Sequence, residues 1–110
     1  MISKELLTLI LPYPQNQFVD FVKENDTYLK YGARVQDQIN IYELAFRCKD
    51  WAKDKEYKIH SSPTQKIEWT AIAQNFDLNK FYYGQNQFYA LTEPEAIFKA
   101  CEWILKEAQK

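Results

Sequence analysis

The pattern of hydrophobic and polar positions changes between helical and extended periods along the chain. Apolar residues recur at spacings of three and four over 3–11, 41–55 and 93–108, which is typical of amphipathic helices. Between these segments, aromatic and β-branched residues alternate with polar ones and predict strands. The predicted strands cover 17–23, 27–31, 57–61, 67–73, 81–83 and 88–91, and 34–39 is either a third short strand or a lead-in to the second helix.

Local signals support the ends of these helices. Pro12 and Pro14 end the first helix, because proline lacks an N–H and disfavours helix in the residue before it. Asn40 and Thr92 each stand three residues before a glutamate, the spacing of a capping box. We therefore predict one α+β domain over 1–110: an antiparallel sheet of four to six strands, covered by two capped helices, plus a short N-terminal helix.

The two longer helices have the same pattern of side chains. Glu43–Trp51 and Glu95–Trp103 both read acid, two apolar residues, Phe, base, two variable positions, acid and Trp. Their predicted buried stripes are listed as Ile41, Ala45, Cys48 and Ala52 in one helix, and Ile97, Cys101, Ile104 and Ala108 in the other.

The Phe and Trp residues widen each stripe on both flanks, so we expect each helix to pack on the sheet and to touch a second element. Whether Trp51 and Trp103 face the sheet or a neighbouring chain stays open. The acid–base pairs four residues apart, Glu43 with Arg47 and Glu95 with Lys99, are interpreted as solvated helix faces.

Composition limits the chemistry available. The chain of 110 residues holds 14 basic and 15 acidic residues, a formal charge of −1, which lacks the basic excess typical of nucleic-acid binding. One histidine, two cysteines and two glycines leave little material for metal sites or phosphate-binding loops, so no metal and no cofactor are expected. Cys48 and Cys101 are interpreted as buried, reduced thiols. The apolar run near the N-terminus is too short for a signal peptide or a membrane span, and we expect a cytoplasmic protein without membrane contact.

The single histidine, His60, precedes two serines but gives weak support for catalysis. Adjacent strand residues point to opposite faces, so the His60 ring and the Ser61 hydroxyl should diverge. The carboxylates of Asp20, Glu68 and Asp77 lack a recognisable acid–base context. We therefore predict no catalytic residues and no enzyme, and a small enzyme around His60 is the weakest hypothesis.

An aromatic hairpin over 80–91 is the candidate binding element. Tyrosine rings offer a large contact area at low entropic cost, either to a protein or as a platform for single-stranded bases. The candidate partner-binding residues are Lys80, Tyr82, Tyr83 and Tyr89. Since few basic residues surround them, we expect a protein partner, and a weak single-stranded nucleic-acid binder is the alternative. We also expect self-association into a homo-oligomer.

The segments NIYELAFRCKDWA, at 40–52, and TEPEAIFKACEWI, at 92–104, resemble small phage and prophage proteins of the ABA-sandwich type. In that group a central helix is followed by strands and a closing helix. The resemblance covers about residues 40–105, and the N-terminal helix and hairpin depart from it. It implies an accessory protein that binds a host or phage protein, as an inhibitor of a host or defence protein, and it carries no catalytic residues to transfer.

Overall fold

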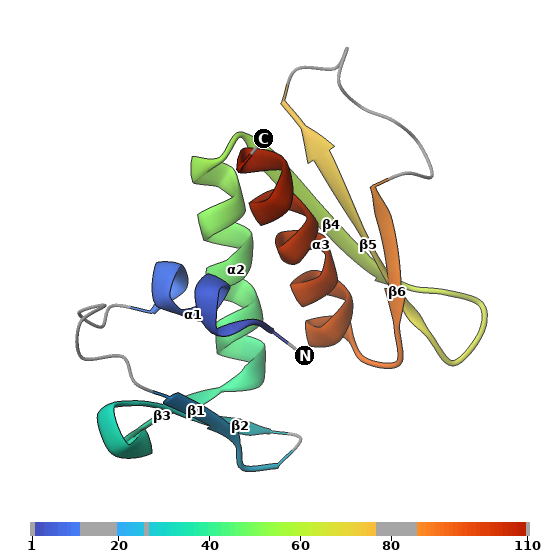
Figure 1. Ribbon diagram of the computed structural model, residues 1–110. Coiled ribbons are helices and arrows are strands. Elements are labelled where there is room, and N and C mark those ends of the chain that lie inside the picture. Colours follow the sequence, from blue (N-terminus) through green and yellow to red (C-terminus); the bar gives the residue numbers. More distant parts are fainter. Residues whose placement is uncertain (1, 12–19, 26, 77–85, 110) are drawn as a thin grey trace.

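The computed structural model describes residues 2–11, 20–25, 27–76 and 86–109. These residues form an α+β fold with three α-helices and two three-stranded antiparallel sheets (Figure 1). The elements are α1 Lys4–Ile10, β1 Asp20–Lys23, β2 Tyr28–Gly32, β3 Asp37–Asn40, α2 Ile41–Asp54, β4 Tyr57–Pro63, β5 Trp69–Asn75, β6 Gln87–Ala90 and α3 Glu93–Ala108.

The predicted α+β class is therefore confirmed, but the single sheet of four to six strands is wrong. The strands divide into β1-β2-β3 and β4-β5-β6. The division has a local cause, because Asn40 is both the last residue of β3 and the N-cap of α2. The 14 residues of α2 then carry the chain about 21 Å away before β4 begins, at about 1.5 Å per residue.

The helix starts follow the predicted capping chemistry. Asn40 Oδ1 accepts from the backbone N–H groups of Tyr42 and Glu43, and Thr92 Oγ1 accepts from that of Glu95. The segment 34–39 contains both predicted alternatives, since a short 3-10 turn, Ala33–Val35, leads into β3 and β3 leads directly into the helix.

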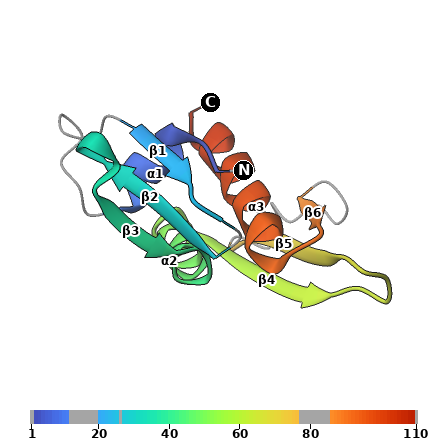
Figure 2. The same ribbon diagram turned by 90° about the horizontal axis from the view of Figure 1, so that it is seen from below.

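The helices form a layer between the second sheet and the N-terminal part of the fold. Helices α2 and α3 run side by side in the same direction, with α1 crossing them on the side away from β4-β5-β6 (Figures 1 and 2). The first sheet lies at the end of the helix pair where α2 begins. One cluster of buried side chains joins all these parts, from Leu29 and Ile39 in the first sheet to Ile59 and Ala71 in the second.

The predicted buried stripes are largely confirmed. All four positions in α2 are buried, as are Ile97, Cys101 and Ile104 in α3. Ala108 is exposed, because it is the last residue of α3 and lies beyond the layer that covers the helix. Ile67, predicted to share a strand face with Trp69, Ala71 and Ala73, is 87% exposed because β5 starts only at Trp69.

The shared Phe and Trp positions are used differently in the two helices. Phe98 is 2% exposed and Phe46 is 64% exposed. Trp51 is buried, whereas Trp103 is half-buried, with its ring centroid 5.6 Å from that of Tyr57 and 6.1 Å from that of Phe88. Both tryptophans therefore belong to the core or its margin. Among the described residues, nothing covers the Phe46 flank of α2 as the equivalent flank of α3 is covered.

Candidate interaction surface

Among the described residues, the outer face of β4-β5-β6 carries polar side chains and the exposed ring of Tyr89. Alternation along the strands directs Ile59, Ala71 and Ala73 toward the helices and their neighbours outward. The outward positions are Lys58, His60, Ser62, Thr70, Ile72, Gln74, Gln87 and Tyr89.

Tyr89 is held at a defined place on this face. It pairs with Thr70 across β5 and β6, and its side chain is 48% exposed. The Tyr89 carbonyl accepts a hydrogen bond of 2.6 Å from Lys99 Nζ of α3, which ties β6 to the helix. Beside it, Gln87 Nε2 donates to Thr70 Oγ1 at 3.2 Å. The ring is thus presented from a strand whose backbone is fixed on both sides.

A shallow pocket of about 480 Å³ adjoins the Tyr89 ring. It lies between the outward face of the sheet and the β4–β5 turn, which Thr64 organises by accepting from Lys66 N and donating to the Glu68 carbonyl. The residues that line it are Thr64, Gln65, Lys66, Glu68, Thr70, Gln87 and Tyr89. Its walls are mainly uncharged hydrogen-bonding groups, and its one lysine is matched by one glutamate.

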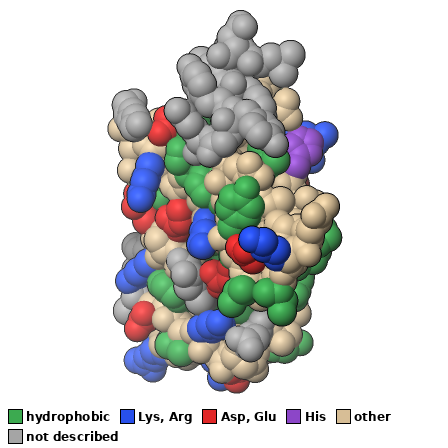
Figure 3. Space-filling model, turned by 90° about the vertical axis from the view of Figure 1, so that its right-hand side faces the viewer, with side chains coloured by type: hydrophobic (Ala, Val, Ile, Leu, Met, Phe, Trp, Pro, Cys, Tyr) green, Lys and Arg blue, Asp and Glu red, His purple; other side chains and the backbone are tan. Residues whose placement is uncertain are grey.

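Two exposed aliphatic side chains lie at the same end of the sheet. Trp69 pairs with Ala90, so Ile67 and Leu91 are each within two positions of that pair. Leu91 is 74% exposed. Figure 3 views the molecule from this side, where hydrophobic side chains reach the surface among acidic and basic ones. We call Ile67, Tyr89 and Leu91, together with the adjoining pocket, the turn-end surface.

The predicted site residues fall only in part within the described chain. Tyr89 is described and exposed, while Lys80, Tyr82 and Tyr83 lie outside the described residues. The predicted hairpin partner of β6 over 81–83 also lies outside them; within the described residues, β6 pairs with β5. Sequence reasoning missed Leu91 and Ile67. The available signal was that each stands next to turn residues rather than inside a strand.

The structure separates the groups considered for catalysis. His60 Nε2 lies 3.0 Å from Gln74 Oε1 on the outer face. The Ser61 hydroxyl points the other way, as alternation predicts, accepting from Lys49 Nζ at 2.9 Å and donating to Glu93 Oε2 at 3.3 Å. This Lys49–Ser61–Glu93 chain of hydrogen bonds links α2, β4 and the start of α3.

The carboxylates do not assemble either. Asp20 is exposed at the start of β1 and its Oδ1 accepts from the Phe21 N–H, while Glu68 lies at the β4–β5 turn on the other sheet. Asp77 lies outside the described residues. Among the residues that the structure describes, no group of three or more His, Cys, Asp and Glu side chains is placed to hold a metal ion.

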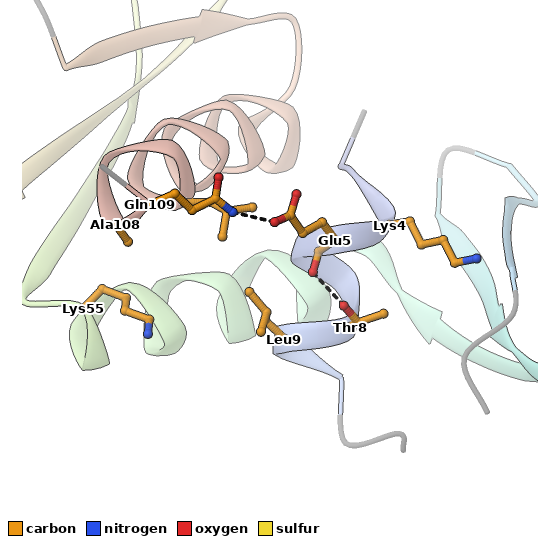
Figure 4. Close-up of a pocket in the computed structure, with 8 residues that line it drawn as sticks. Lys4, Glu5, Thr8, Leu9, Lys55, Ala108 and Gln109 are labelled. Carbon is orange, nitrogen blue, oxygen red and sulfur yellow. Dashed lines mark hydrogen bonds between the residues drawn. The ribbon is translucent and has the colours of Figure 1, made fainter. Parts of the chain in front are cut away.

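A larger cavity of about 630 Å³ lies between α1 and the C-terminal ends of α2 and α3 (Figure 4). Its lining residues are Lys4, Glu5, Thr8, Leu9, Lys55, Leu105, Ala108 and Gln109. The Glu5 side chain accepts from Gln109 Nε2, and the Glu5 carbonyl accepts from Thr8 Oγ1 at 2.7 Å. The central polar groups of this cavity therefore bind one another and connect α1 to the end of α3.

The two cysteines meet where α2 and α3 pack together. Both are free and buried, as predicted, and Cys101 Sγ donates to the Cys48 carbonyl at 3.5 Å. Burial raises the pKa of the Cys48 thiol well above its ordinary value, and the neighbouring Cys101 raises it further. The pair contributes packing, and the Cys48 thiol is not activated for nucleophilic chemistry.

The fold is that of a small α+β protein whose second sheet presents both polar and apolar side chains at one end. Comparison with family models, with curated proteins and with solved structures finds no match for this chain. Within the described residues, no helix has the length and apolar character that crossing a membrane requires.

Proposed function

We propose that this protein is a non-enzymatic binding protein that recognises another protein through the turn-end surface. The observation that carries the proposal is the grouping of Ile67, Tyr89 and Leu91 at one end of a rigid sheet. Large side chains that protrude from fixed backbone make good anchors, because little conformational freedom is lost when they bind. The polar pocket beside them supplies hydrogen-bonding groups that select one partner from others.

The charge on this surface favours a protein over a nucleic acid. Lys66 and Glu68 both line the pocket, so their charges offset each other where a phosphate backbone would need a basic track. A single-stranded nucleic-acid binder therefore remains the alternative, and it predicts affinity that falls steeply with salt concentration.

The resemblance to phage proteins supplies a class of partner for this proposal. A surface that offers apolar anchors and hydrogen-bonding groups is suited to a small accessory protein that binds and blocks a host or defence protein. In this proposal the chain inhibits by occupying a site on its partner.

The test compares two variants that remove the same kind of side chain from different places. Ile67→Ser/Tyr89→Ser/Leu91→Ser alters the turn-end surface, whereas Tyr42→Ser/Phe46→Ser removes exposed rings from α2. Each is used with the wild-type protein to capture proteins from a host-cell lysate. We expect one protein to be captured stoichiometrically by the wild type and by the α2 variant, and lost with the turn-end variant.

Two results would contradict the proposal. One is capture of the same protein by all three forms, which would place the binding site elsewhere. The other is capture of no protein, together with binding to a single-stranded oligonucleotide that weakens steeply between low and moderate salt. That second result would establish the nucleic-acid alternative.

A further inference from the structure

The outward side of α3 carries four charged residues in a regular order. Glu95, Lys99, Glu102 and Lys106 are spaced by four, three and four positions, so they form one stripe along the helix. The stripe lies opposite the buried positions of α3, such as Ile97. We call these four residues the α3 stripe.

The order of charges in the α3 stripe is complementary to itself when it is reversed. The stripe reads acid, base, acid, base, and its midpoint falls between Ala100 and Cys101. A second α3 placed antiparallel about that midpoint brings Glu95 opposite Lys106 and Lys99 opposite Glu102. All four contacts across the axis then join opposite charges, as a two-fold interface requires of a self-complementary surface.

The equivalent stripe on α2 lacks this property, which makes the feature specific to α3. The corresponding residues of α2 are Glu43, Arg47, Asp50 and Asp54. Reversal there places Glu43 opposite Asp54, which is a repulsive contact. Two helices with the same apolar pattern therefore differ in whether their outward faces can meet a copy of themselves.

A groove with an apolar floor accompanies the α3 stripe. It has a volume of about 300 Å³ and runs between α3 and β6. Phe88, Phe98 and Trp103 form its floor, and all four residues of the stripe line it. The aliphatic stems of the partner's lysines can pack on the half-buried rings of Phe88 and Trp103, while their ammonium groups reach the carboxylates.

Two residues of the stripe are held in place by hydrogen bonds that use only part of their donor or acceptor groups. Glu102 Oε1 accepts from the Ser3 N–H at 2.7 Å, and Lys99 Nζ donates to the Tyr89 carbonyl at 2.6 Å. A carboxylate has a second oxygen and an ammonium has three donors, so each group can also contact a second chain. Side chains that are already ordered lose less entropy on association.

We propose that two copies of this chain associate through their α3 helices, antiparallel about a two-fold axis, with the α3 stripes paired. The α3 stripe shares no residue with the turn-end surface, although Lys99 bonds the Tyr89 carbonyl, and different variants test the two proposals. Since the paired charges are partly solvated, the dimer should weaken as the salt concentration rises.

Charge reversal tests this proposal by sedimentation equilibrium. Lys99→Glu/Lys106→Glu makes the stripe wholly acidic, and Glu95→Lys/Glu102→Lys makes it wholly basic. Each alone should raise the dimer dissociation constant at least tenfold, because four attractive contacts become repulsive. Mixed in equal amounts, the two variants should form a heterodimer at least as stable as the wild-type dimer.

The matched control is Lys53→Glu/Lys58→Glu, which makes the same change in net charge at exposed positions away from α3. It should dimerise like the wild type, and so should Ile67→Ser/Tyr89→Ser/Leu91→Ser. Circular dichroism establishes that each variant is folded. A monomeric wild type at 0.5 mM protein in low salt would overturn the proposal, as would failure of the two folded stripe variants to associate when mixed.

Discussion

At the scale of single residues, the equivalent positions of Phe46 and Phe98 show how context sets the energetic role of a side chain. Both rings occupy the same flank of helices with the same pattern, but only the ring on α3 is covered. Removing a buried ring loses its transfer free energy and leaves a cavity, whereas an exposed ring contributes little to the free energy of unfolding.

The expected result is that Phe98→Ala lowers the free energy of unfolding by about 3–5 kcal/mol and Phe46→Ala by less than about 1 kcal/mol. Urea denaturation followed by circular dichroism measures both values. Equal losses for the two variants would show that the Phe46 flank of α2 is covered in solution.

Cys48 gives a second prediction at this scale, through its raised pKa. The folded protein keeps this thiol protonated at pH values where the unfolded chain ionises, from about pH 8.5 upward. The contribution of Cys48 to stability is therefore complete below that pH and declines above it, by up to about 1.4 kcal/mol per pH unit.

Cys48→Ala removes this titration, so the difference in free energy of unfolding between wild type and variant should shrink as the pH rises from 7.5 to 10. Urea denaturation across this range measures the difference. A difference that stays constant to pH 10 would show that the Cys48 thiol ionises in the folded protein as it does in the unfolded one.

At the scale of elements, the sequence predicts helices better than it predicts sheets, for a physical reason. Caps and apolar stripes are local, so both long helices were predicted to within one residue of their observed ends. Sheet membership depends on where a helix delivers the chain, and the role of Asn40 as strand end and N-cap separated the two sheets. β4 shows the same limit, because the strand predicted over 57–61 continues to Pro63.

The candidate site was predicted only where a local signal existed. The exposed ring of Tyr89 follows from strand alternation, which presents every second side chain outward. Ile67 and Leu91 belong to the surface because of the register between β5 and β6, which brings the turn beside the end of β6. That register is a non-local property, and periodicity along the chain does not encode it.

The two N-caps give a prediction for the helices. Asn40 accepts two backbone hydrogen bonds, at 2.8 and 3.4 Å, and Thr92 accepts one at 3.4 Å. Asn40→Ala should therefore lower the free energy of unfolding by about 1–2 kcal/mol, and Thr92→Ala by about 0.5–1 kcal/mol. Asn40→Asp, which keeps the accepting oxygen, is the control and should retain most of the stability. The reverse order of the two alanine variants in urea denaturation would contradict the capping geometry.

At the scale of the whole molecule, the two sheets share one cluster of buried side chains. Leu29 of β2 belongs to the same cluster as Ile59 of β4, through the helices between them. A cluster that spans both sheets predicts that they unfold together.

Leu29→Ala should lower the free energy of unfolding by about 2–5 kcal/mol. It should also make the slow amides of β5 exchange faster, since β5 would open with the first sheet. The free energy of opening measured at these amides should fall by the same amount as the free energy of unfolding. Unchanged exchange in β5, with loss of protection confined to β1-β2-β3, would show that the two sheets unfold as separate units.

We propose two recognition surfaces with different chemistry: a mixed polar and apolar one at the end of the second sheet, and a self-complementary charged one on α3. The Ser61 hydroxyl accepts from Lys49 and donates to Glu93, and these three residues join α2, β4 and α3. Binding, rather than catalysis, is the activity that we propose for this arrangement.

The most direct test of that activity is hydrogen exchange of the protein alone and in complex with the partner captured from the lysate. We predict slower exchange on binding at the amides of 64–68 and 87–91, which carry the turn-end surface, and unchanged exchange at 42–47 of α2. Protection confined to any other segment, with 64–68 and 87–91 exchanging as in the free protein, would contradict the account.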